Sequence, residues 1–73
     1  MDRSPRYIQF RALLRQIRED AGLTQVELSE RLGRPQSYVS KVELGERKID
    51  MLETLDFCKA CGVDPAGFLK RLE

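Results

Sequence analysis

Histidine and tryptophan are absent from this 73-residue chain, and only two cysteines are present. Two cysteines supply only half of the ligands that a structural zinc site takes, and no histidine can complete the set. The chain also lacks a histidine base and a glycine-rich phosphate loop. Its carboxylates are spread over expected helix starts and exposed faces. We therefore expect no enzyme activity, no metal and no cofactor.

Long apolar runs are missing as well. No stretch approaches the roughly 20 residues of a membrane-spanning helix, and the first residues, MDRSPRY, lack the apolar stretch of a signal peptide. Hydrophobic residues make up 41% of the chain and charged residues 34%, which is typical of a folded helical domain. A chain of this length has room for one domain with a modest core. We expect a single cytoplasmic domain over residues 1–73, without membrane contact.

The net charge is only +1, but the charges are unevenly distributed. Residues 1–30 hold five basic and five acidic side chains, whereas residues 31–48 hold five basic and two acidic ones. Residues 49–73 hold three basic and five acidic side chains. The local excess of positive charge over residues 31–48 favours contact with phosphate on one side of the molecule.

Helix signals occur five times, and no alternating strand pattern is present. Ser4 is a suitable N-cap, and Thr24 and Asp50 each precede a glutamate by three positions, as in a capping box. The expected helices run from about Pro5 to Ala21, between Thr24 and Gly33, over about 36–44, between Asp50 and Gly62, and from Asp64 onward. The apolar residues expected to face inward are Tyr7, Phe10, Leu14, Ile17, Ala21, Leu28, Leu32, Val39, Val42, Met51, Leu55, Cys58 and Cys61, and the last helix carries apolar Phe68, Leu69 and Leu72.

The second and third expected helices are short and joined by a tight turn around Gly33 and Pro35. If Val39 and Val42 face inward, the third helix leaves four polar side chains outside: Gln36, Ser37, Ser40 and Lys41. Glutamine, serine and lysine are side chains that hydrogen-bond to base edges and phosphates in the DNA major groove. The pattern predicts a helix-turn-helix DNA-binding domain.

Three segments of the chain occur in an order typical of a known family: LLRQIREDAGLTQVELSERLG, SYVSKVELGERK and ETLDFCKACGVDPAGFL. From about Phe10 to Leu69 the chain resembles the Cro/phage-repressor helix-turn-helix family, also called the XRE regulators. The resemblance implies a compact, lambda-repressor-like all-α domain of five helices, with the helix-turn-helix formed by the second and third. It also implies a homodimeric transcriptional regulator that binds double-stranded operator DNA with its third helix in the major groove. We expect a repressor.

The resemblance implies base contacts by Gln36, Ser37 and Lys41, with Ser40 nearby, and a phosphate contact by Gln25. It also implies a structural ion pair between Arg18 and Glu43, which would link the first helix to the end of the third. At position 29, where the family commonly has alanine, Ser29 is expected to let the second and third helices approach closely.

Several basic side chains flank the expected recognition helix, and we predict that Arg34, Arg47 and Lys48 contact phosphates. Tyr38 is assigned with them, because its hydroxyl could donate to a phosphate. Equally, its ring could cover the turn against the second helix. For all of the predicted contacts, the alternative is a solvated polar surface.

The expected dimer surface lies in the fourth and fifth helices and comprises Leu52, Phe57, Phe68, Leu69 and Leu72. The alternative is that most of these residues fill the core of the monomer. Cys58 and Cys61 are expected to be free thiols packed in the core, with redox sensing as the alternative.

The main rival to the DNA-binding function is a protein-interaction module, such as an antitoxin, that binds a protein partner and uses DNA only for autoregulation. Antitoxins often carry an added toxin-binding segment, and the sequence ends at Glu73, soon after the fifth helix. We therefore rank this alternative second. A restriction–modification controller protein is a further alternative within the DNA-binding class.

Overall fold

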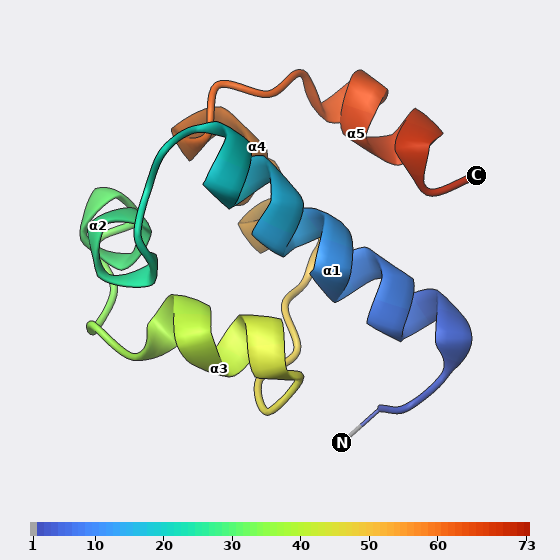
Figure 1. Ribbon diagram of the computed structural model, residues 1–73, viewed down its shortest axis with the longest axis horizontal. Helices are drawn as coiled ribbons and strands as arrows, with labels where there is room; N and C mark the ends of the chain where they lie inside the picture. The colour runs from blue at the N-terminus through green and yellow to red at the C-terminus, as the bar shows by residue number, and fades with distance from the viewer. Residues whose placement is uncertain (1) are drawn as a thin grey trace.

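The computed structural model describes residues 2–73, and within this range it contains five α-helices and no strand. They are α1 (Pro5–Asp20), α2 (Gln25–Arg31), α3 (Tyr38–Leu44), α4 (Met51–Ala60) and α5 (Pro65–Arg71). Helix α1 crosses the centre of the molecule, with α3 below it, α2 to one side and α4 behind it (Figure 1). The arrangement confirms the predicted all-α, five-helix fold. Among the residues described, no helix combines the length and the apolar character needed to cross a membrane.

Helices α1, α2 and α4 begin where the sequence predicted their capping residues. Ser4 Oγ accepts a hydrogen bond from the Tyr7 N–H at 3.2 Å, and both arms of each predicted capping box are present. In α2, the Thr24 hydroxyl accepts from the Glu27 N–H at 3.0 Å, and the Glu27 carboxylate accepts from the Thr24 N–H at 2.9 Å. Because the first amides of a helix have no partner within it, these bonds fix where each helix starts.

The third helix begins two residues later than expected, at Tyr38 rather than at about position 36. The N–H of Tyr38 bonds to the Pro35 carbonyl at 2.9 Å, which closes a turn over residues 35–38 before the helix. The first helical bond then runs from the Lys41 N–H to the Ser37 carbonyl. Gln36 and Ser37 therefore lie in the turn that precedes α3.

The core is formed by all five helices and the loop before α2. Its buried apolar residues are Leu14, Ile17, Leu23, Leu28, Tyr38, Val39, Val42, Phe57, Cys58 and Phe68. Helix α1 packs against α3, which in turn packs against α2. The recognition segment is thus supported from behind by the longest helix of the described chain.

The predicted inner face of α4 is wrong in part. Met51 and Leu55 are 59% and 37% exposed, whereas Thr54, Phe57 and Cys58 are buried. Apolar residues occur nearly all round this helix, so periodicity alone did not select the face. The large ring of Phe57 occupies the core, and it turns Met51 and Leu55 outward.

The predicted dimer surface also needs correction. Phe57 and Phe68 are fully buried in the monomer core and cannot contribute to a surface. Leu72 is half-buried and packs against the core, while Leu52 and Leu69 are 72% and 45% exposed. Only Leu52 and Leu69 remain as fully surface members of the predicted set. Ala21, assigned to the inner stripe of α1, is likewise exposed at the helix end.

Candidate nucleic-acid interface

The buried hydroxyl of Ser29 joins the two helices of the helix-turn-helix. Ser29 Oγ lies 2.9 Å from the Gln25 carbonyl and 3.2 Å from the Gln36 carbonyl, and it accepts a bond from the Val39 N–H at 3.1 Å. A hydroxyl has one proton, so it donates to one carbonyl at a time while accepting from Val39. This residue therefore satisfies a free amide in the first turn of α3 and fixes that helix relative to α2.

An ion pair between Arg18 and Glu43 holds the other end of α3. Arg18 Nε and Nη2 bond to the two Glu43 carboxylate oxygens at 2.7 and 3.1 Å, and Arg18 Nη1 donates to the Leu23 carbonyl at 2.8 Å. The two side chains are only 11% and 5% exposed. The hydrogen bonds to Glu43 raise the pKa of Arg18 above its ordinary value. The ion pair implied by the family resemblance is thus present in the fold.

Gln25, assigned to a phosphate contact, lies against this ion pair. Its Nε2 amide donates to Glu43 Oε1 at 2.9 Å, and the residue is half-buried. Gln25 therefore belongs to the network that fixes α3, and contact with DNA remains a prediction for its other polar atoms.

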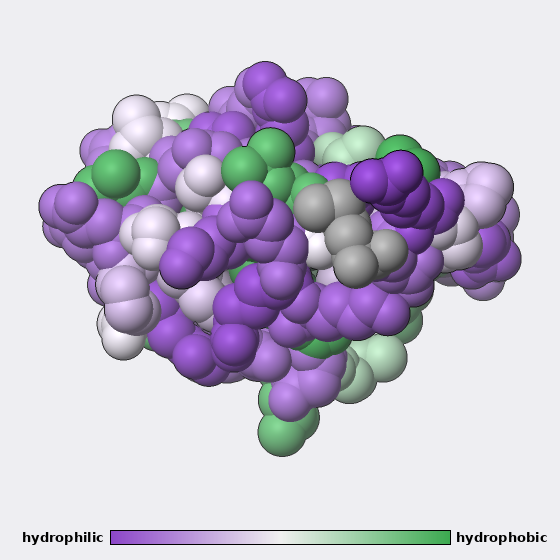
Figure 2. All heavy atoms as spheres, turned by 90° about the horizontal axis from the view of Figure 1, so that it is seen from below, coloured by the Kyte–Doolittle hydropathy of each residue, from purple (hydrophilic) through white to green (hydrophobic). Residues whose placement is uncertain are grey.

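The four predicted base-contacting residues share the outer side of α3 and its preceding turn. Gln36, Ser37 and Lys41 are exposed, and Ser40 is half-buried. None of these four side chains makes a hydrogen bond or ion pair with another residue of the range 2–73. Figure 2 shows the molecule from below, the side on which α3 lies in Figure 1, and this face is mainly hydrophilic.

Three of the predicted phosphate contacts meet at a residue that the sequence assigned only to a helix cap. Glu53 Oε2 accepts from the Tyr38 hydroxyl at 2.7 Å, from Arg47 Nη2 at 2.9 Å and from Arg34 Nη2 at 3.3 Å. The Tyr38 hydrogen bond is the main cause that lowers the pKa of Glu53 to about 2. We call Arg34, Tyr38, Arg47 and Glu53 the Glu53 cluster.

The ring of Tyr38 lies between the two arginines of this cluster. The guanidinium carbon of Arg34 is 4.8 Å from the ring centroid, and that of Arg47 is 5.1 Å away. The ring itself is buried and lies 6.2 Å, between centroids, from the ring of Phe57 in α4. Burial raises the pKa of Tyr38, as does its bond to Glu53. The ring of Tyr38 therefore packs against α4, a contact that neither of its two predicted roles included.

A shallow recess of about 220 Å³ adjoins the Glu53 cluster. Its lining residues come from the turn before α3, from α3 itself and from the loop after it: Arg34, Pro35, Ser37, Tyr38, Lys41 and Arg47. Three of these six side chains are cationic. The recess is therefore suited to an anionic group that lies beside the recognition helix.

Lys48, the last predicted phosphate contact, bonds to the N-terminal segment. Its Nζ lies 3.0 Å from Asp2 Oδ2 and 5.3 Å from the centroid of the Tyr7 ring. The hydrogen bond from the Ser4 N–H, followed by that from Lys48, lowers the pKa of Asp2 to about 2. The loop after α3 is thereby tied to the start of α1.

The glycine that ends α3 has a specific structural requirement. Gly45 has a φ of +81°, and a Cβ at this position would lie 2.8 Å from the guanidinium of Arg11. Arg11 Nη1 in turn lies 3.4 Å from the Glu43 carbonyl at the end of the helix. Arg11 was not predicted from the sequence, because its contact joins residues 32 positions apart.

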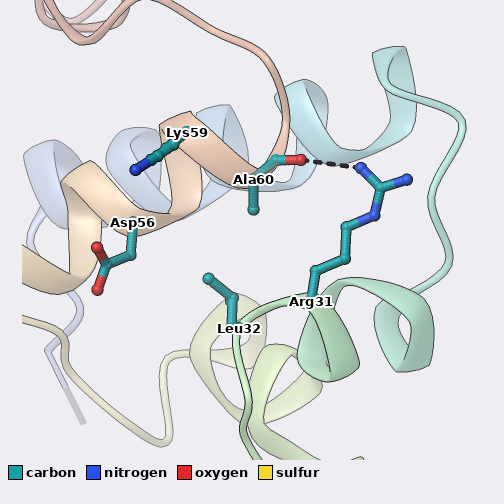
Figure 3. Close-up of a pocket in the computed structure, with 5 residues that line it drawn as sticks. All are labelled: Arg31, Leu32, Asp56, Lys59 and Ala60. Atoms are coloured by element: carbon teal, nitrogen blue, oxygen red, sulfur yellow. Dashed lines mark hydrogen bonds between the residues drawn. The ribbon is translucent and has the colours of Figure 1, made fainter.

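A second groove, of about 460 Å³, lies between the end of α2 and α4. It is lined by Arg31, Leu32, Asp56, Lys59 and Ala60 (Figure 3). Arg31 Nη1 donates to the Ala60 carbonyl at 3.2 Å and so caps the end of α4. This bond joins α2 to the end of α4 across the groove.

The two cysteines are free thiols at the end of α4, Cys58 buried and Cys61 half-buried. Burial raises the pKa of both, which disfavours the reactive thiolate. Within residues 2–73, no three histidine, cysteine, aspartate or glutamate residues gather as a metal site would require.

Two short helices joined by a tight turn, the second with an unpaired polar face, define a helix-turn-helix domain. Accordingly, the family model for the helix-turn-helix domain matches residues 9–68. An XRE-family like protein from Pseudomonas syringae pv. tomato str. DC3000 is 51% identical, and the match covers 92% of this chain and 82% of that one with a TM-score of 0.86. This chain belongs to the XRE family of helix-turn-helix DNA-binding regulators, which are not enzymes.

More distant solved structures share the fold. The restriction–modification controller protein C.Esp1396I is 22% identical, with 94% of this chain and 91% of that one covered and a TM-score of 0.85. The same controller, as a tetramer in complex with its natural 35-base-pair operator, matches at 22% identity over the same shares with a TM-score of 0.83. No match was found among the curated proteins.

Proposed function

We propose that this protein binds a specific operator in double-stranded DNA as a homodimer and represses transcription. The observation that carries the proposal is the polar outer side of α3 and its preceding turn, where Gln36, Ser37 and Lys41 are exposed and make no side-chain bond within residues 2–73. Meanwhile the helix itself is fixed at one end by Ser29 and at the other by the Arg18–Glu43 pair. A rigid helix that carries free polar side chains is suited to reading base edges in the major groove.

Base recognition falls to Gln36, Ser37, Ser40 and Lys41 in this proposal. Glutamine can pair with adenine through two hydrogen bonds, and lysine can donate to the acceptors of guanine. Gln36 and Ser37 lie in the turn before α3, so they would enter the groove ahead of the helix.

Phosphate contacts fall to Gln25, Arg34, Tyr38, Arg47 and Lys48. All five already bond to carboxylates of the protein, and Arg34, Arg47 and Lys48 are exposed. A guanidinium has five N–H donors, so an arginine bonded to Glu53 retains donors for a phosphate. These residues would fix the position of the protein on the DNA without reading its sequence.

A homodimer would use the exposed apolar face of α4, formed by Met51, Leu52 and Leu55, with Leu69 of α5 as a further exposed apolar residue. One domain of this size covers a small part of a DNA helix, and two copies on half-sites about 34 Å apart increase both affinity and specificity. The operator-bound tetramer of C.Esp1396I supports assembly on DNA within this fold.

The same apolar face would bind a different protein if the chain acted as an antitoxin or as another interaction module. Sedimentation of the purified protein, alone and with operator DNA, separates the two functions. A monomer at high micromolar concentration that stays a monomer on DNA contradicts the homodimer.

The decisive experiment for DNA binding is selection of bound sequences from random duplex DNA, with the parent protein and with Lys41→Ala. We expect the parent to select a palindromic motif, and Lys41→Ala to lose preference at one symmetric pair of positions. If the parent enriches no sequence, operator recognition is wrong.

A further inference from the structure

One carboxylate joins both ends of the segment that would read DNA. Arg34 lies in the turn before α3, and Arg47 lies in the loop after it, yet both bond to Glu53 Oε2 at the start of α4. The Tyr38 hydroxyl donates to the same oxygen and places its ring between the two guanidinium groups. A single acidic side chain of α4 thus joins the turn before α3, α3 itself and the loop after it.

The two oxygens of Glu53 have separate roles. Oε1 accepts from the Asp50 N–H at 3.2 Å and completes the capping box of α4. Oε2 takes part only in the Glu53 cluster. The contacts of Oε2 are therefore not needed for the helix cap, and their removal can be tested without loss of the cap.

Arg34 and Arg47 each bond to Glu53 and still retain further N–H donors. Their side chains are 40% and 43% exposed, whereas the side chain of Glu53 is only 16% exposed. The carboxylate therefore lies beneath the surface that Arg34 and Arg47 present. An incoming phosphate could bond to the remaining N–H groups of both without displacing Glu53.

We propose that Glu53 is a positioning residue for DNA recognition: it holds Arg34 and Arg47 on either side of Tyr38, so that both meet the same stretch of DNA backbone when α3 is in register. This inference rests on the proposed function and extends it to a residue that does not touch DNA. Because the pKa of Glu53 is about 2, the carboxylate is ionised at all physiological pH values, and the arrangement is permanent rather than switched.

The test compares Glu53→Gln with Glu27→Gln. Both glutamates occupy the third position of a capping box, glutamine is accepted there, and both changes remove one negative charge. Glu27, however, forms no ion pair with a described residue. The probes are the duplex selected by the parent protein and a scrambled duplex of equal length and composition, with Kd measured at one salt concentration.

We expect Glu53→Gln to weaken binding to the selected duplex by roughly tenfold, because two long side chains must then be ordered on binding. Binding to the scrambled duplex should stay constant or tighten, and Glu27→Gln should keep the parent ratio of the two affinities. An unchanged ratio in Glu53→Gln overturns the inference, as does an equal fall of the ratio in both variants. If the parent itself does not distinguish the duplexes, the proposed function fails, and the inference fails with it.

A second readout needs no DNA. Nitrogen-15 relaxation of the arginine Nε groups should show Arg34 and Arg47 ordered in the parent, ordered in Glu27→Gln and mobile in Glu53→Gln. If Glu53→Gln is poorly folded, Glu53→Asp replaces it, because the shorter side chain keeps the negative charge but moves the carboxylate away from Arg34 and Arg47. Arginines that stay equally ordered in the folded variant overturn the inference.

Discussion

The two parts of the proposed DNA interface differ in how far their side chains are fixed before DNA arrives. On the outer side of α3, Gln36, Ser37 and Lys41 are exposed and make no side-chain bond within the described chain. By contrast, every predicted phosphate contact is bonded to a carboxylate: Gln25 to Glu43, Arg34, Tyr38 and Arg47 to Glu53, and Lys48 to Asp2.

This difference matches the different roles proposed for the phosphate-contacting and the base-contacting side chains. Phosphates recur along any duplex whatever its sequence, so the side chains that bind them can be fixed in position before DNA binds. Base edges differ from site to site, and side chains that read them benefit from freedom to adjust or to bind through water. The frame that carries both sets is the buried network around Arg18 and Glu43.

The largest expected effect comes from breaking that frame. Glu43→Ala leaves the buried Arg18 guanidinium without its carboxylate and also removes the partner of Gln25. Loss of one partner from a buried ion pair costs about 3–5 kcal/mol. We expect a large fall in the thermal midpoint, measured by circular dichroism, with a smaller change in base preference. Glu46→Ala, at an exposed acidic residue just after the same helix, is the control, and equal midpoints for Glu43→Ala and the parent would contradict the prediction.

The next largest effect is expected at low pH, where the ionised Glu53 carboxylate should stabilise the fold less. The pKa of Glu53 falls from an ordinary 4.5 to about 2 in the folded protein, so its contribution to stability is complete above about pH 5. That contribution is lost as the pH falls from 4.5 towards 2, because the unfolded chain takes up the proton first. The difference in thermal midpoint between the parent and Glu53→Gln should therefore shrink over this range.

The effect at Glu53 should be smaller than that of Glu43→Ala, because the side chain of Glu53 is 16% exposed and that of Glu43 only 5%. A midpoint difference that stays constant from pH 6 to pH 2 would show that the Glu53 carboxylate gains nothing from its three partners. Comparison with the same variant at each pH removes the parallel titration of Asp2, whose pKa is also lowered to about 2.

Local contacts explain why much of the fold was predictable from the sequence. The capping boxes at Thr24 and Asp50 join residues three positions apart, and the stripe of Leu14 and Ile17 follows one helix face. Signals of this kind are visible along the chain. They gave the number and order of the helices, and the family resemblance added the Arg18–Glu43 pair.

The Glu53 cluster was not predictable, because its bonds join residues 6, 15 and 19 positions apart across two loops. Glu53 already had a sufficient local explanation as a cap residue, and nothing in its spacing indicated a second role. The face of α4 was missed for a related reason: with apolar residues on nearly every side, its orientation depends on Phe57 fitting the core. Periodicity identifies a face only when the opposite face is polar.

The smallest expected effect distinguishes Lys48, a predicted phosphate contact, from Lys41, a predicted base contact. Lys48→Ala should weaken binding to the selected and the scrambled duplex alike, and it should flatten the salt dependence of log Kd by about 0.9. Lys41→Ala should instead weaken the selected duplex more than the scrambled one. Asp2→Asn provides a further comparison, since it frees Lys48 from its ion pair and should tighten binding to both duplexes. If Lys48→Ala changed base preference and Lys41→Ala did not, the division between a fixed phosphate-binding flank and a free base-reading face would be reversed.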